Sequence, residues 1–249
     1  MNILVKKTRE VGTSAGVLLP RSWLNKEVVV TLLHPSKERI LKEVTEYLIN
    51  NKLNEEVKGI YIYGSHARGE SDPNSDIDIL IITQETNKLI NYDNYEILLV
   101  SEKNFAEKLP KNLAYLSALK EAEVLLNKNL LDLYRKKNIK LKIKDYIKEI
   151  ESVTNINEEA IVLCEKDNKM LPDGIIYSIV LRLKELHLIK SLKSRKPYSN
   201  AVFLKFVPKE VNSAYLRVKR NEKELNNISP DELIPLISLS KKWLKELKE

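Results

Sequence analysis

The amino-acid sequence predicts an α+β protein in which a small mixed sheet with helices is followed by a helical bundle. Apolar runs typical of strands are mixed with helical patterns in residues 35–129, and helical patterns fill residues 130–249. Residues 1–34 have few helix signals and a valine-rich end, which indicates a β-hairpin element. We therefore expect three domains with the boundaries 1–34, 35–129 and 130–249.

The first of these domains is short and punctuated by Gly12, Gly16 and Pro20. The segment "EVVVTLL" at 27–33 has the composition of a strand, and a turn of helix is expected around Arg21 to Leu24. Thirty-four residues rarely bury enough apolar surface to fold alone. We therefore expect this element to pair with a second copy in a homodimer or to pack on the rest of the chain.

The second domain begins with an amphipathic helix over residues 36–51, for which Ser36 is a suitable N-cap. The apolar runs that follow predict strands and a further helix. The predicted strands are Gly59 to Tyr63, Ile77 to Thr83, Tyr95 to Ser101 and residues 122–127, and the helix starts near Asn104.

The third domain carries long helical patterns, of which the clearest starts at Pro172 and Asp173. Further helical patterns follow in residues 200–207, 211–220 and 229–249, so a small helical bundle is expected.

Composition narrows the classes of function. The 249 residues are 43% hydrophobic and carry a net charge of +7, which favours polyanionic partners such as nucleic acid or nucleotide phosphates. A lysine-rich solvated surface is the alternative explanation. The single cysteine, Cys164, excludes an intrachain disulfide and suits a reducing cytoplasm. With no signal peptide and no apolar stretch near the roughly 20 residues of a membrane span, a cytoplasmic protein without a membrane partner is expected.

The most informative stretch is "GSHARGESDPNSDIDIL", residues 64–80, directly after the apolar run "GIYIY". Glycine at the end of a strand permits a sharp turn and a close approach of a ligand. If a helix starts there, its free N–H groups and the Ser65 hydroxyl favour phosphate, and Arg68 adds a cation one turn later. Gly64, Ser65 and Arg68 are therefore candidate nucleotide-binding residues.

The same stretch continues into a predicted strand that carries two acids. Side chains alternate between the two faces of a strand, so Asp76 and Asp78 point the same way. Two carboxylates held close together repel each other, and Mg²⁺ bound with substrate phosphates relieves that repulsion. The next predicted strand offers Glu96 as a third acid, whereas Asp93 is read as a turn residue.

This stretch resembles the signature of the DNA polymerase β-like nucleotidyltransferase superfamily, and it is most similar to the minimal nucleotidyltransferases that include antitoxins of toxin–antitoxin pairs. The resemblance spans about residues 36–128. It implies that Gly64 and Ser65 hold the triphosphate, and that Asp76 and Asp78 bind Mg²⁺ with help from a third acid. The family usually has aspartate in the third place, where this chain offers Glu96. Arg68 and Glu70 are expected to pair and brace the loop.

The reaction implied by the resemblance is attack of an acceptor hydroxyl on the α-phosphate of a nucleoside triphosphate, ATP above all, with two Mg²⁺ ions as cofactors. In that site Asp76, Asp78 and Glu96 are the catalytic and metal-binding residues. A protein hydroxyl is the first candidate acceptor, and RNA ends and small-molecule hydroxyls stay open.

The N-terminal element is similar to half of an AbrB-like swapped hairpin. The matching positions are Gly12, Ser14, Gly16, Pro20 and Val28 to Val30. The resemblance implies that paired copies bind DNA through basic residues, here Lys6, Lys7, Arg9 and Arg21. A packing hairpin without DNA contact is the alternative. A DNA-binding regulator with an inactive transferase fold is accordingly one rival function.

The helical segment resembles the bundle that follows the catalytic domain in kanamycin nucleotidyltransferase-like enzymes, and also HEPN domains. The first likeness implies that the bundle forms one wall of the acceptor site. The second rests on Arg182 and His187, which have the spacing of the HEPN ribonuclease motif, so a ribonuclease is the other rival function. A solvated helix face is the alternative reading of these two residues.

Overall fold

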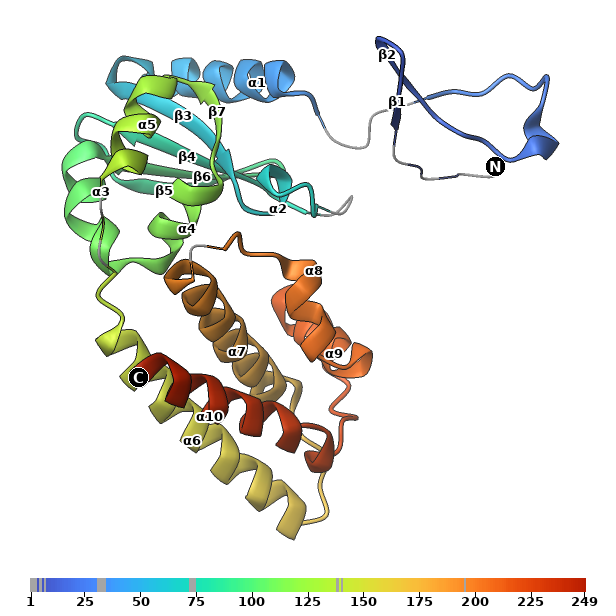
Figure 1. Ribbon diagram of the computed structural model, residues 1–249, viewed down its shortest axis with the longest axis vertical. Helices are drawn as coiled ribbons and strands as arrows, with labels where there is room; N and C mark the ends of the chain where they lie inside the picture. Colours follow the sequence, from blue (N-terminus) through green and yellow to red (C-terminus); the bar gives the residue numbers. More distant parts are fainter. Residues whose placement is uncertain are drawn as a thin grey trace. The chain divides into compact units, whose positions relative to one another are not determined.

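The computed structural model describes residues 4, 6, 8–30, 35–71, 75–137, 139, 141–194 and 196–249 (Figure 1). The chain splits into two compact units, Met1–Pro35 and Ser36–Glu249. The division into three domains stays a prediction.

The first unit contains a short hairpin. Strand β1 (Arg9–Val11) pairs antiparallel with β2 (Ser14–Gly16), and Gly12 turns the chain with a φ of 60°. The turn of helix expected near Arg21 is confirmed as the 3-10 helix η1 (Arg21–Trp23). The strand expected over 27–33 is wrong for residues 27–30, and residues 31–33 lie outside the described residues. Residues 27–30 pair with neither β1 nor β2, and a strand needs such a neighbour for its backbone hydrogen bonds.

The second unit is built on a mixed sheet of five strands in the order β5-β6-β4-β3-β7, which confirms the predicted α+β class. Strand β4 runs parallel to β6, whereas β3 is antiparallel to both β4 and β7, and β5 is antiparallel to β6. The strands are β3 (Val57–Tyr63), β4 (Ile77–Thr83), β5 (Lys88–Tyr92), β6 (Tyr95–Ser101) and β7 (Glu123–Leu126).

Helices cover both faces of this sheet. Helix α1 (Lys37–Asn50) is capped as expected, because the Ser36 side chain accepts a hydrogen bond from the backbone N–H of Arg39. It packs on the face formed by Ile77, Ile79 and Ile81. Helices α3 (Glu102–Lys108), α4 (Leu113–Glu121) and α5 (Lys128–Lys136) pack on the face of Leu80 and Ile82. Since side chains alternate along β4, Asp78 lies on the face of α4.

The structure differs from the sequence-based expectation between β4 and α5. Strand β5 was not predicted, because it is an edge strand on which only Ile90 is buried. The helix expected from about Asn104 begins at Glu102 and is interrupted at η3 (Leu109–Lys111), where Pro110 lacks a backbone N–H. Leu131 and Tyr134 of helix α5 belong to the same hydrophobic core as the sheet residues Leu80 and Ile82. The helices therefore change from packing on the sheet to packing on one another only after α5.

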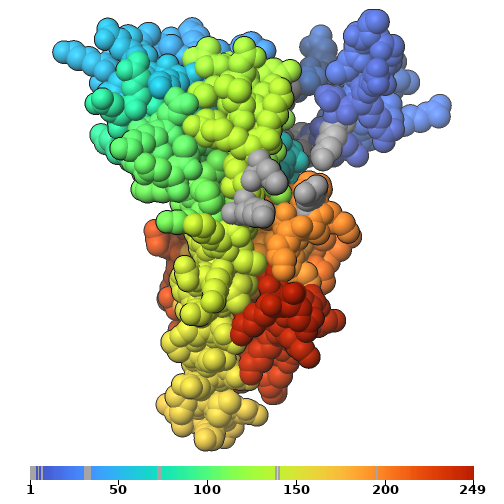
Figure 2. Space-filling model, turned by 60° about the vertical axis from the view of Figure 1, so that its left-hand side comes forward, coloured from blue at the N-terminus to red at the C-terminus, as the bar shows by residue number. Residues whose placement is uncertain are grey.

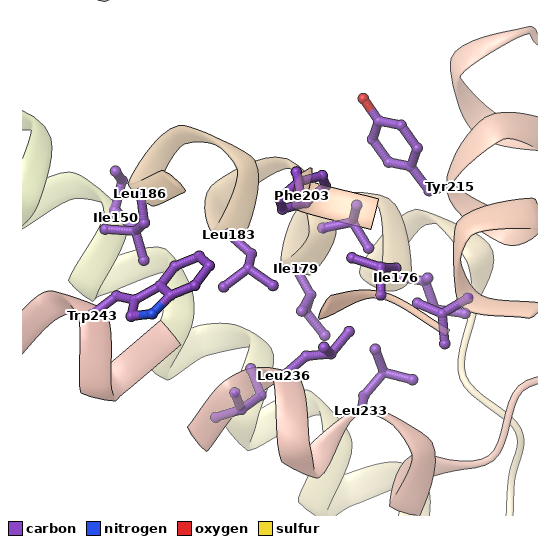
Figure 3. Close-up of a cluster of buried hydrophobic side chains, with 14 of the residues drawn as sticks. Ile150, Ile176, Ile179, Leu183, Leu186, Phe203, Tyr215, Leu233, Leu236 and Trp243 are labelled. Atoms are coloured by element: carbon purple, nitrogen blue, oxygen red, sulfur yellow. The ribbon is translucent and has the colours of Figure 1, made fainter. Parts of the chain in front are cut away.

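The remaining helices form the predicted bundle. They are α6 (Lys144–Lys166), α7 (Asp173–Lys193), α8 (Asn200–Phe203), α9 (Lys209–Lys219) and α10 (Ile234–Lys248), with short 3-10 turns η4 (Leu204–Phe206) and η5 (Pro230–Glu232). Figure 2 shows α6, in yellow, beside α10, in red. Leu183 and Leu186 of α7 face Trp243 of α10 in the bundle core (Figure 3).

Among the described residues no helix is both long enough and apolar enough to cross a membrane.

Candidate active site

The predicted acids gather where β4 and β6 begin. Asp78 and Glu96 are direct partners in the parallel β4–β6 ladder, so their side chains point to the same face. Asp76 comes two residues before Asp78 and is exposed. Asp93 lies in the turn between β5 and β6 with a φ of 53°, which agrees with its interpretation as a turn residue.

The electrostatics of Asp78 reflect this clustering. Burial, together with the negative charges of Glu96 and Asp76, raises the pKa of Asp78 to about 6, while the positive charges of Lys219 and Arg68 act in the opposite direction. Burial also raises the pKa of Tyr63, whose ring lies on the same face, and Asp78 and Glu96 add to that effect. The protein therefore holds a group of partly buried carboxylates that repel one another, at the end of the sheet where β4 and β6 begin.

Gly64 brings the turn after β3 against these acids. Its φ is 71°, which disfavours any residue with a Cβ, and a Cβ at this position would lie 1.9 Å from Oδ2 of Asp78. Ser65 follows as the second residue of the short helix α2 (Gly64–Ala67) and is half-buried. The structure thus brings Gly64 directly to Asp78, as the predicted phosphate turn and metal site require.

Arg68 is the centre of an ion-pair network in which one partner was not predicted. Its Nη1 donates to Oε2 of Glu121 over 2.6 Å, and its Nε donates to Oε2 of Glu70 over 3.0 Å. Oε1 of Glu121 also accepts a hydrogen bond of 3.1 Å from the backbone N–H of Gly64. Glu121 is the last residue of α4, where a negative charge interacts unfavourably with the helix macrodipole. This unfavourable position is the sequence signal that could have indicated a special role for Glu121.

Glu70 joins the motif to the bundle. It pairs with Arg68 as expected, and it also accepts hydrogen bonds from Oγ of Ser199 (2.6 Å) and from the backbone N–H groups of Asn200 (3.0 Å) and Ala201 (3.3 Å). Although burial acts to raise it, these hydrogen bonds lower the pKa of Glu70 to about 2. The guanidinium of Arg68 lies over the ring of Tyr198, 5.2 Å from its centroid. The first turn of α8 is therefore held against the predicted nucleotide loop.

Two lysines of the bundle complete the surroundings of the acids. Lys219, at the end of α9, is close enough for its charge to lower the pKa of Asp78. On α7, burial lowers the pKa of Lys184 to about 8, with further contributions from the neighbouring charges of Lys219 and Arg68, while Glu70 and Asp78 oppose the shift. The spacing of motifs in the sequence gave no indication of Lys184, because its position depends on how α7 packs.

Arg182 and His187 are not brought together. Nη1 of Arg182 pairs with Glu185 (2.8 Å) and with Glu149 of α6 (3.5 Å). The ring of His187 lies among aromatic rings, those of Tyr198, Phe203, Phe206 and Trp243. Burial lowers the pKa of His187, which favours a neutral packed ring.

The donor chemistry at this edge suits a hard divalent cation. The described residues contain no group of three or more His, Cys, Asp or Glu side chains already arranged around one point as a metal site. Mg²⁺ commonly binds through one or two carboxylates together with substrate phosphates. The paired carboxylates of Asp78 and Glu96, with Asp76 nearby, fit that mode of binding.

A mixed sheet with a Gly-Ser turn packed against an Asp-x-Asp strand, and a third acid on the neighbouring strand, defines a DNA polymerase β-like nucleotidyltransferase. A family model described as nucleotidyltransferase domain matches residues 39–199, more than half of the chain. The chain belongs to this family.

Comparison with other proteins adds only distant likenesses. No curated protein matches the chain. A nucleotidyltransferase-like protein from Exiguobacterium sibiricum shares 13% identity at a TM-score of 0.33, over 83% of this chain and 75% of that chain. A spectinomycin adenyltransferase from Enterococcus faecialis, crystallised with ATP and spectinomycin, shares 16% identity at a TM-score of 0.33, over 83% of this chain and 98% of that chain. Likenesses this weak carry no inference about substrates.

Proposed function

We propose that the protein is a Mg²⁺-dependent nucleotidyltransferase that moves a nucleoside monophosphate, AMP from ATP as first candidate, to an acceptor hydroxyl. The observation that carries the proposal is the packing of the Gly64 turn directly against Asp78, which lies opposite Glu96 in the β4–β6 ladder. A protein hydroxyl is the first acceptor to test, with RNA ends and small-molecule hydroxyls as the others.

In the proposed reaction the acceptor oxygen forms a bond to the α-phosphorus while the bond from that phosphorus to the bridging oxygen of the β-phosphate breaks. The hydroxyl proton leaves toward a carboxylate, for which Glu96 is the candidate, and pyrophosphate departs. A divalent metal held by Asp76, Asp78 and Glu96 would supply positive charge for the attacking and leaving oxygens. Ser65 and Arg68 orient the phosphate chain, and Lys184 and Lys219 supply positive charge from the bundle side.

The function is tested by incubating the protein with Mg²⁺, each α-labelled nucleoside triphosphate in turn, and a cell lysate. We expect label on an acceptor with the wild-type chain, and at least about a 10²–10³-fold loss in the Asp76→Asn, Asp78→Asn double variant, because preorganised charge at the reacting centre is removed. Protease and ribonuclease treatment of the product identifies the class of acceptor. Absence of transfer, or transfer that survives in the double variant, would contradict the proposal.

Lys184 offers a second measurement on the same site. Replacing Lys184 with glutamine removes a partly buried positive charge, so we expect nucleotide affinity to fall about tenfold while the melting temperature stays unchanged or rises. Lys190→Gln, on the same helix, is the matched control, because Lys190 pairs with Glu246 and lies over the ring of Trp243. Titration calorimetry and thermal unfolding give the two quantities. Equal loss of affinity in both variants would argue against a role for Lys184 in binding phosphate.

The two rival functions stay hypotheses with weaker support. DNA binding through residues 1–34 depends on Lys6, Lys7, Arg9 and Arg21, of which Lys7 lies outside the described residues. For a ribonuclease, Arg182 and His187 would have to act on one phosphodiester, yet their side chains have different neighbours.

A further inference from the structure

The carboxylate of Glu121 binds the same donors that a nucleotide phosphate is expected to use. Its Oε2 accepts from Nη1 of Arg68 (2.6 Å), and its Oε1 accepts from the backbone N–H of Gly64 (3.1 Å). Both side chains of the ion pair are largely shielded, with 18% of Arg68 and 14% of Glu121 exposed. Carboxylates and phosphates are both recognised by arginine and by backbone N–H groups, so the two anions are alternatives at these donors.

Neither the helix nor the arginine requires a carboxylate at position 121. Glu121 is the last residue of α4, where a negative charge interacts unfavourably with the helix macrodipole. Arg68 already has a carboxylate partner, because its Nε donates to Glu70, which also binds the first turn of α8. Arg68 would therefore keep an ion-pair partner if Glu121 moved away.

The surrounding charge makes the presence of Glu121 costly for an incoming anion. Asp78 lies directly against Gly64, and Glu96 and Asp76 add negative charge next to Asp78. A phosphate at Arg68 and Gly64 would meet Glu121 at close range, and like charges at such distances repel strongly where solvent is excluded. Only a phosphate chain that brings its own cations would offset this repulsion.

We propose that Glu121 is a specificity-determining residue that occupies the phosphate donors of Arg68 and Gly64 in the nucleotide-free protein and must be displaced by the nucleotide. The inference rests on the proposed function. It assigns Glu121 a selective role: it excludes inorganic phosphate and free pyrophosphate, and it admits a metal-bound triphosphate. Selectivity of this kind comes from a repulsive group placed against the wrong ligand.

The test measures the affinity of Glu121→Gln for the Mg²⁺ complexes of ATP, GTP, CTP and UTP, and for inorganic pyrophosphate without metal, by titration calorimetry. We expect the triphosphate that binds best to bind Glu121→Gln about tenfold more tightly than it binds the wild-type chain. The affinity for pyrophosphate should increase by a larger factor than the affinity for the triphosphate. Glu121→Asp separates reach from charge, because the shorter side chain cannot span both donors, and a smaller gain is expected. Glu123→Gln is the matched control, since Glu123 lies two residues away and pairs with Lys37 (3.0 Å).

Circular dichroism and thermal unfolding establish that each variant is folded before its affinity is compared. Unchanged or weaker binding in folded Glu121→Gln and Glu121→Asp overturns the inference, because Glu121 would then only brace the turn. If the wild type transfers label and the aspartate double variant does not, the proposed function stands even when the inference falls. If neither the wild type nor Glu121→Gln binds any triphosphate, both fall. Triphosphate binding by Glu121→Gln but not by the wild type would support the inference in its strongest form.

Discussion

Replacing Asp78 with asparagine is expected to make the metal-free protein more stable at pH 7 while it abolishes nucleotidyl transfer. The folded pKa of Asp78 is raised from 3.8 to about 6, chiefly by burial and then by Glu96 and Asp76. The folded state therefore holds this proton more tightly than the unfolded state, and the free energy of unfolding falls as the pH rises from about 4 to 6. Above pH 6 the ionised carboxylate lowers the free energy of unfolding by its full amount, on the order of 3 kcal/mol.

Asparagine has nearly the same shape and no charge, so the variant should lose this penalty. We expect its melting temperature at pH 7 to exceed that of the wild type by about 6–12 °C, and the difference to vanish near pH 4. Chemical denaturation across this pH range, in the presence of a chelator, measures the effect. Adding Mg²⁺ should stabilise the wild type more than the variant, because only the wild type keeps the ionised carboxylate at position 78.

Asp93→Asn is the matched control, because the same chemical change is made at an exposed turn position. It should shift neither the melting temperature nor its dependence on pH by a comparable amount. A wild-type chain more stable than Asp78→Asn at pH 7 would show that the carboxylate of Asp78 is stabilised by its surroundings, and would remove the argument that it is poised for a cation.

Local spacing in the sequence was sufficient to predict the positions of the acids that lie on neighbouring strands. The β4–β6 register places Glu96 beside Asp78, whereas Asp76 lies just before β4 and its shared face with Asp78 stays a prediction. The bounds of β4 and β6 agree with the predicted strands because both are apolar runs with a buried face. The functional roles of these residues stay predictions.

The groups that the sequence did not reveal come from helices whose placement depends on packing. Glu121 reaches Arg68 because α4 ends beside the turn, and Lys184 faces the motif because Leu183 and Leu186 fix the rotation of α7 in the bundle core. Glu70 was expected only to pair with Arg68, and its hydrogen bonds to Ser199 and Asn200 join segments about 130 residues apart in the chain. Contacts over such separations leave no periodic signal in one sequence.

Replacing Gly64 with alanine is expected to destabilise the protein by about 3 kcal/mol and to abolish transfer. A residue with a Cβ at a φ of 71° costs about 1–2 kcal/mol. The added methyl group would also lie 1.9 Å from Oδ2 of Asp78 and 2.7 Å from its Cγ, so the turn or the strand must shift. Forcing extra volume into such a contact costs a further 1–3 kcal/mol or so. Thermal unfolding should show a melting temperature about 6–12 °C lower.

Gly69→Ala separates the two causes, because Gly69 has a similar φ of 65° but open space where its Cβ would be. It should cost only the backbone part, about 1–2 kcal/mol. In the double variant Gly64→Ala, Asp78→Ala the nearest contact is relieved, since only the Cβ of residue 78 remains, at 3.2 Å. We therefore expect the double variant to be more stable than the sum of the two single effects predicts, which is the coupling that a direct contact produces. If the effects of the two substitutions simply add, the Gly64 turn does not press on Asp78 in solution, and the juxtaposition on which the proposed function depends is absent.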